Sequence, residues 1–240
     1  MFCPNPANTL EHVWPDWILK SLKAAQPIRH TIGKKPPFYV NNPEVKVRAV
    51  CKKCNEGWMS DLETLNRPLI GALMHDLSAP IDATQQANLA KWTIKAAMLI
   101  DVMNRQRPQF YGANERILLR TDSSIPTGTT IWLGRYCRSS FHAGGTDIWP
   151  NKGEISKVAR CCVTTVIVGH LAIQSVTIHA LRPEYDNEPI TIKPGRWNQL
   201  LGLAWPSAGS ISWPPSLTFT DSGISSIASL MDRWRTGTEI

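Results

Sequence analysis

The sequence contains no apolar run that approaches the ~20 residues that a helix needs to span a bilayer, which excludes a membrane-spanning helix. Its start, MFCPNPANTL, has neither the basic stretch nor the hydrophobic stretch of a secretory signal. It also has no internal repeat. We therefore expect a cytoplasmic protein with no membrane partner.

Acidic residues are scarce relative to basic ones. The 19 Asp and Glu residues face 26 Lys and Arg residues, for a formal net charge of +7 and a pI of about 9.2. This balance favours an anionic partner, of which nucleic acid is the commonest. Hydrophobic residues make up 42% of the 240 residues, enough for a packed core in one large domain or two small ones.

Cysteine is also sparse, with 6 residues. In a cytosolic chain, closely spaced cysteines indicate metal binding or packing more than disulfides. Cys161 and Cys162 are adjacent in a strand-like run, where consecutive side chains face opposite ways. We therefore interpret them, together with Cys137, as core thiols and not as metal ligands.

The first half of the chain shows three regular patterns. Alternating charged and apolar residues predict a strand over 44–50, and the following composition predicts a helix from Asn55 to about Leu65, limited by Pro68. Residues 21–44, rich in Pro, Gly and Asn, predict an irregular connection. The clearest helix spans 83–104, with a buried stripe formed by Leu89, Trp92, Ala96, Leu99 and Met103.

The second half is mainly strand-like. We expect strands over 129–137 and 160–181, with a turn or a bulge at Gly169-His170, a short edge strand over 189–195 and a terminal helix over 221–234. The pattern breaks between 75 and 85. We therefore predict an α+β chain with two domains, residues 1–75 and 76–240, the second of unknown role.

Two short motifs near the N-terminus carry chemistry. The stretch TLEHVWPDWILK (9–20) sets Glu11 beside His12, and a C-x2-C pair, Cys51 and Cys54, follows the strand that ends at residue 50. Cys3 supplies a third thiol near the Glu-His pair. Zn²⁺ favours four soft or borderline ligands in a tetrahedron, and a C-x2-C turn supplies two of them. The alternative is a plain buried strand, with Glu11 solvated and His12 incidental.

The order of these motifs resembles the zinc-stapled form of the HNH, or ββα-metal, nuclease family. In that family a Cys pair precedes an acid-His dipeptide at a strand end, and C-x2-C precedes Asn or His at a helix start. The segments EHVWPDW and CKKCNEGWMSDLE are similar in sequence to segments of HNH proteins of bacteria and their phages. The resemblance covers about residues 3–65 and implies an N-terminal ββα-metal, treble-clef-like domain, followed by a helix and antiparallel strands.

The resemblance also implies roles for individual residues. His12 would activate water as the general base, while Glu11 and Asn55 would bind one catalytic divalent ion, Mg²⁺, Mn²⁺ or Ni²⁺. One metal suffices because the imidazole replaces the second. The expected activity is hydrolysis of phosphodiester bonds in DNA, double-stranded or branched, by a metal-dependent endonuclease. The departures from the family pattern are Glu in place of the usual Asp and an incomplete set of cysteines.

The resemblance implies a structural zinc bound by Cys3, Cys51 and Cys54. Pro6 stands where a C-x2-C pair beginning at Cys3 would place its second thiol, but the seven residues between Cys3 and Glu11 suit a Cys3 that is itself the second thiol. Its partner would then lie one position before Met1. We expect either a Cys codon directly upstream of Met1 or a fourth ligand supplied by water or by His30.

Several basic residues flank these motifs. Arg48, Lys52 and Lys53 lie beside the C-x2-C turn, and Lys34 and Lys35 lie in the connection between the two halves of the motif. We interpret them as contacts to DNA phosphates, against the alternative of solvated surface charge. Two further alternatives stay open: a catalytically inactive, zinc-stabilised nucleic-acid-binding module, and an enzyme whose chemistry lies in the C-terminal region.

Overall fold

The computed structural model describes residues 1–22, 28–30, 38–40, 45–103, 108–148, 158–180 and 200–220. The helices are α1 (Asp16–Ser21), α2 (Lys52–Cys54), α3 (Ser60–Met74), α4 (Ala83–Met103) and α5 (Ala113–Thr121), with a wide π-type turn, η1 (Asn55–Met59), between α2 and α3. The strands are β1 (Thr9–His12), β2 (Ile28–His30), β3 (Phe38–Val40), β4 (Lys46–Val50), β5 (Ala79–Ile81), β6 (Thr129–Ile148), β7 (Val158–Ala180), β8 (Leu201–Trp205), β9 (Ile211–Trp213) and β10 (Thr218–Phe219). The mixture of helices and antiparallel strands confirms the α+β class.

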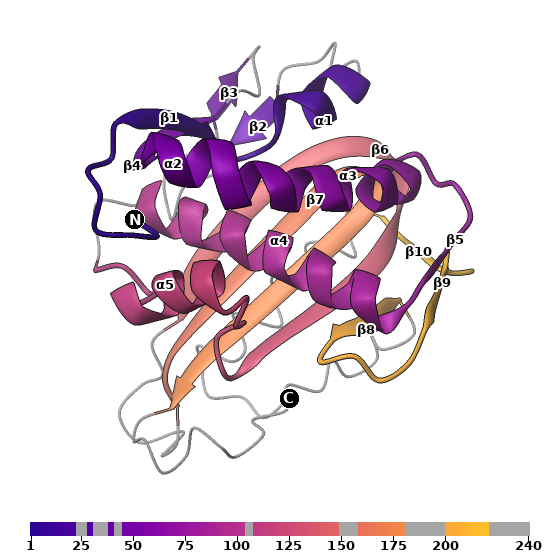
Figure 1. Cartoon of the computed structure of the whole chain (residues 1–240). Helices are drawn as coiled ribbons and strands as arrows, with labels where there is room; N and C mark the ends of the chain where they lie inside the picture. The colour runs from indigo at the N-terminus through magenta and orange to yellow at the C-terminus, as the bar shows by residue number, and fades with distance from the viewer. Residues whose placement is uncertain are drawn as a thin grey trace.

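A long antiparallel pair, β6 and β7, forms the centre of the largest sheet (Figure 1). Strand β8 pairs antiparallel and β10 pairs parallel with β6. Arg135 of β6 pairs with Leu171, whereas Ser140 pairs with Gly169, so β6 bulges at this point while β7 continues as one strand. The predicted irregularity at Gly169-His170 is therefore a bulge and not a turn.

Glycine is required at position 169 for two reasons. Its φ is +61°, in the left-handed region that other residues adopt at a cost. A Cβ built on Gly169 would also lie 2.1 Å from the carbonyl oxygen of Met74, the last residue of α3. The glycine therefore allows the end of α3 to pack directly on the bulged part of the sheet.

Both faces of this sheet are buried. Figure 1 shows α3 and α4 lying over one face of β6 and β7, where Ile131 and Cys162 join the main hydrophobic cluster. Trp132 and Cys161 belong to a second cluster on the opposite face. The prediction that Cys161 and Cys162 are core thiols facing opposite ways is confirmed. The same prediction for Cys137 is wrong, because this residue lies in the bulge of β6 and is exposed.

Helix α4 agrees with the predicted span to within one residue. Leu89, Trp92, Ala96 and Leu99 are buried, as expected from their helical spacing. Met103 is 36% exposed because the stripe reaches the last turn of the helix, beyond the elements that cover it. The helix packs against α3 on one side and against β6, β7 and β8 on another.

The predicted end of the preceding helix at Pro68 is wrong. The interruption lies earlier, at Gly57, whose φ of −99° and ψ of −118° are not helical. Helix α3 then runs through Pro68 to Met74. Leu69, Ile70, Leu73 and Met74 are all buried after the proline, and burying each such side chain contributes about 1.5–3 kcal/mol, which outweighs the ~3 kcal/mol cost of an internal proline.

The N-terminal part is built on a short ladder between β1 and β4, with Thr9 opposite Val50 and His12 opposite Lys46. Strand β4 confirms the predicted strand over 44–50. The span 21–44, predicted as an irregular connection, contains a second ladder, β2 with β3. The predicted strand over 189–195 and helix over 221–234 lie outside the described residues.

One hydrophobic cluster runs across the predicted domain boundary. Trp14, which follows the Glu-His pair, lies 6.3 Å from the ring of Trp92 in α4 and 5.6 Å from that of Phe141 in β6. The cluster continues from Phe2 to Trp213. The division into residues 1–75 and 76–240 stays a prediction. Among the described helices, none combines the length and the apolar character that crossing a membrane requires.

Candidate metal and catalytic site

Cys3, from the N-terminal segment, meets Cys51 and Cys54 at α2. The Sγ atom of Cys3 lies 3.4 Å from that of Cys51 and 3.5 Å from that of Cys54. The three sulfur atoms all lie within 4.8 Å of one another, so these residues could hold a metal ion. Regular tetrahedral zinc with Zn–S bonds of ~2.3 Å sets its sulfur atoms about 3.8 Å apart. The donor type and the spacing are thus compatible with zinc.

The turn that presents the C-x2-C pair is fixed by backbone hydrogen bonds. The N–H groups of Cys54 and Asn55 donate to the carbonyl oxygen of Cys51 at 3.1 Å and 3.0 Å. The N–H of Lys52 donates to the side-chain oxygen of Asn8 at 2.9 Å, which ties the turn to the N-terminal segment. A hydrogen bond from the backbone N–H of Cys54 lowers the pKa of the Cys51 thiol to about 7, whereas burial raises the pKa of Cys54 to about 11.

The three residues assigned to catalysis line one open cavity of about 340 Å³. Glu11 and His12 come from the end of β1, and Asn55 comes from the first residue of η1. The other lining residues are Pro15, Asp16, Trp17, Glu56, Ser60 and Glu63. Glu11 and Asn55, 44 positions apart in the sequence, thus face the same space.

The side chain of Asn55 is held from β1. Its Nδ2 donates to the hydroxyl oxygen of Thr9 at 3.3 Å, and the Thr9 hydroxyl donates to the carbonyl oxygen of Val50 at 3.0 Å. With the amide nitrogen engaged by Thr9, the amide oxygen of Asn55 is the group left to act as a ligand. The same two strands therefore position the Glu-His pair and the asparagine.

Glu11 is buried and charge-compensated. It is 5% exposed, which contradicts the alternative in which Glu11 is solvated. Burial raises the pKa of its carboxyl, and the ammonium of Lys95 opposes this rise. The Nζ atom of Lys95, in α4, lies 3.7 Å from Oε1 of Glu11 and 2.6 Å from Oε1 of Glu63.

Lys95 and Glu63 were not identified from the sequence. Glu63 lies in the first turn of α3, eight positions after Asn55 and beyond the break at Gly57, so helical spacing does not relate the two. Lys95 lies three positions after Trp92 and four before Leu99, within the buried stripe of α4. A lysine at an apolar stripe position is the signal that could have found the pair, since lysine is almost never fully buried unless it is paired.

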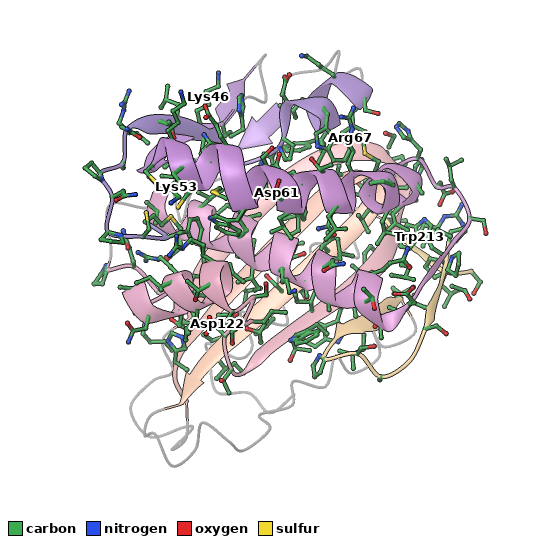
Figure 2. The ribbon with its side chains drawn as sticks, in the orientation of Figure 1. Lys46, Lys53, Asp61, Arg67, Asp122 and Trp213 are labelled. Atoms are coloured by element: carbon green, nitrogen blue, oxygen red, sulfur yellow. The ribbon has the colours of Figure 1, made fainter. Side chains whose placement is uncertain are left out.

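The basic residues beside the C-x2-C turn are accessible. Arg48, Lys52 and Lys53 are all exposed, and Lys52 also lies 3.8 Å from Glu56 across one helical turn. Figure 2 places Lys53 on α2, with sulfur atoms close by, and Lys46 on the neighbouring strand at the same end of the molecule. Lys34 and Lys35 lie outside the described residues, and so does the side chain of His30.

Comparison with protein families, with curated proteins and with solved structures finds no significant match. The resemblance to HNH nucleases therefore rests on Cys3, the Glu11-His12 pair and the segment from Cys51 to Asn55. The structure shows where those residues lie: Glu11, His12 and Asn55 line one cavity, and Cys3 meets Cys51 and Cys54 in one cluster beside Asn55.

Proposed function

We propose that this chain is a metal-dependent endonuclease of the HNH type that hydrolyses phosphodiester bonds in DNA. The observation that carries the proposal is the shared cavity of Glu11, His12 and Asn55, directly beside the cluster of Cys3, Cys51 and Cys54. The ladder of β1 and β4 followed by a helix supports the ββα arrangement that such a site needs.

His12 acts as the general base in this proposal. It lies at the end of β1, on the wall of the cavity, and it is partly exposed, so a water molecule can reach its imidazole. His12 is the last residue of β1 and is more exposed than Glu11, although both line the cavity. The imidazole removes a proton from the water that attacks the phosphorus atom.

Glu11 and Asn55 would hold the catalytic divalent ion. Both offer oxygen ligands, which Mg²⁺ and Mn²⁺ favour. Asp16, Glu56 and Glu63 line the same cavity, and each of them is paired with a lysine, Lys20, Lys52 or Lys95. The ion, when bound, supplies charge stabilisation on the phosphate and on the departing oxygen.

The cysteine cluster would bind structural zinc. It joins the N-terminal segment to the turn before Asn55, since Cys3 contacts both Cys51 and Cys54. Structural zinc sites commonly supply much of the folding free energy of such short segments. In this proposal the zinc fixes the distance between β1 and the start of η1, and therefore the geometry of the cavity.

The exposed Arg48, Lys52 and Lys53 would contact the DNA backbone. They lie on β4 and α2, the elements that lead into Asn55. Contacts of this kind supply sequence-independent affinity and position a duplex without reading its bases. The formal net charge of +7 supports the same class of partner.

The deciding experiment is cleavage of plasmid DNA by purified protein in Mg²⁺, Mn²⁺ or Ni²⁺. His12→Ala should lower the rate by ~10²–10⁴, the usual effect of losing a general base. His75→Ala is the matched control, because His75 is exposed, bonds to the Ser21 hydroxyl at 2.7 Å and lies outside the cavity. Wild-type cleavage by the His12 variant would refute the assignment.

A second candidate function is a zinc-stabilised nucleic-acid-binding module without catalysis. The position of Lys95 favours it, because its ammonium lies 3.7 Å from Glu11 and offsets the charge of that carboxylate. This candidate predicts DNA binding with no saturable binding of Mn²⁺ at Glu11. Titration of the zinc-loaded protein with Mn²⁺, with Glu11→Gln as the comparison, separates the two functions.

A further inference from the structure

Lys95 is the most unusual charged residue in the described part of the chain. Its side chain is 0% exposed, whereas Lys91, one turn earlier on α4, is partly exposed. Lys95 does not line the cavity itself; Glu11 and Glu63, which do, lie between its ammonium and the open space. The ammonium therefore sits behind the wall of the cavity, enclosed by protein.

The contacts of Lys95 to the two carboxylates are unequal. The 2.6 Å separation from Glu63 is a hydrogen bond, while the 3.7 Å separation from Glu11 is longer than one. Glu63 fixes the ammonium, and the ammonium then neutralises Glu11 from a distance. The Glu11 carboxylate is thus held in place and keeps lone pairs for another cation.

Stability alone is a poor explanation of this arrangement. Taking a lysine and a carboxylate out of water is costly, and well-packed apolar residues at the same positions are often as stable or more so. The neighbours of Lys95 on the stripe, Trp92 and Leu99, show what the core otherwise places there. Packing does not require the ammonium of Lys95, and this ammonium lies 3.7 Å from Glu11, which lines the cavity. An effect on Glu11 explains the buried lysine better than stability does.

We propose that Lys95 is a positioning residue of the nuclease site: its enclosed ammonium joins Glu11 of β1 to Glu63 of α3 and sets how strongly, and where, the cavity binds a divalent cation. This inference rests on the proposed function. Two carboxylates and one ammonium leave one negative charge in the cluster, which limits its attraction for a cation and keeps that cation toward Glu11 and Asn55.

The test measures Mn²⁺ affinity by calorimetry without DNA, and then turnover on plasmid at saturating Mn²⁺. Lys95→Met removes the charge and keeps most of the volume. Mn²⁺ should bind at least about tenfold more tightly, because a competing positive charge a few ångströms away is gone. Turnover should nevertheless fall at least about tenfold, because Glu63, freed from the ammonium, would compete with Asn55 for the ion, and misplaced reacting groups raise the barrier.

Two further variants complete the series. Glu63→Gln leaves Lys95 with Glu11 alone, so Mn²⁺ should bind at least about tenfold more weakly. This variant changes a partly exposed side chain, and it tests the inference even if Lys95→Met does not fold. Lys91→Met, which removes the same charge from the same helix, should leave Mn²⁺ affinity within about twofold of wild type.

The outcomes separate the inference from the function on which it rests. A folded Lys95→Met protein whose Mn²⁺ affinity is unchanged or weaker overturns the inference, even while the wild-type protein cleaves DNA. Unchanged affinity in Glu63→Gln overturns it as well. A wild-type protein that binds Mn²⁺ and shows the expected order of affinities, but does not cleave DNA, overturns the nuclease function and leaves the role of Lys95 standing.

Discussion

If the cysteine cluster binds zinc, removing one of its thiols should lower the thermal stability of the protein. Replacing Cys54 by serine removes a thiol that is 1% exposed and lies 3.5 Å from Sγ of Cys3. Two thiols remain, and a two-thiol site should lose most of its zinc at the concentrations present during purification. If the cluster holds zinc as proposed, the N-terminal segment then loses the link that the metal makes to α2.

The size of the effect follows from what that segment buries. Phe2, next to Cys3, is fully buried and packs edge-to-face on Trp58 with ring centroids 4.9 Å apart. Losing a buried phenylalanine costs about 3–5 kcal/mol, and each kcal/mol moves the Tm of a chain of this size by about 2–4 °C, so the Tm should fall by roughly 6–20 °C.

The assay combines metal analysis by mass spectrometry with thermal unfolding followed by fluorescence. Wild-type protein should hold one zinc per chain, and Cys54→Ser should hold little. Cys137→Ser is the matched control, because Cys137 is exposed and lies outside the cluster. A Cys54→Ser protein with a full zinc content and a Tm within about 2 °C of wild type would contradict the reasoning.

Three other predictions concern the fold and the basic surface. Gly169→Ala should destabilise the chain by at least ~1–2 kcal/mol through its left-handed φ alone, whereas Gly71→Ala, within α3 and with open space at its Cβ, should be neutral or stabilising; denaturant unfolding compares them. Burial raises the pKa of the Cys161 thiol to about 12, so at pH 8 this thiol should resist iodoacetamide while the exposed Cys137 reacts. Mass spectrometry of digested peptides measures the modification of both. Replacing both Lys52 and Lys53 by alanine should make log affinity for DNA depend less steeply on log salt concentration, by the amount expected for about two phosphate contacts. An unchanged slope would mean that these lysines face solvent.

Local patterns were enough to predict the elements whose residues follow one period. The stripe of α4 and the alternation of β4 each repeat over several residues, so burial of one face decides the structure. The adjacent cysteines of β7 were placed correctly for the same reason. Cys137 and Pro68 were not, because a bulge in β6 and the long buried face of α3 depend on neighbours that are distant in the sequence.

Some residues of the cavity could likewise be predicted from local patterns, and others could not. Spacing and resemblance predicted Glu11, His12 and Asn55, which lie near the two motifs, and the structure brings these residues to one cavity. Lys95 could not be placed beside them from the sequence, because the contact depends on how α4 packs against α3 and β4. Only a three-dimensional arrangement shows that a lysine 84 positions after Glu11 lies 3.7 Å from its carboxylate.

The position of Trp14 limits how this chain can be divided. Its ring lies between Trp92 of α4 and Phe141 of β6, so the segment that carries the Glu-His pair is completed by residues from the other half of the chain. A fragment that ended at residue 75 would expose this indole and the core face of α3 to water. The segment that carries the Glu-His pair therefore shares its core with α4 and β6, and cutting the chain after residue 75 should destabilise that segment.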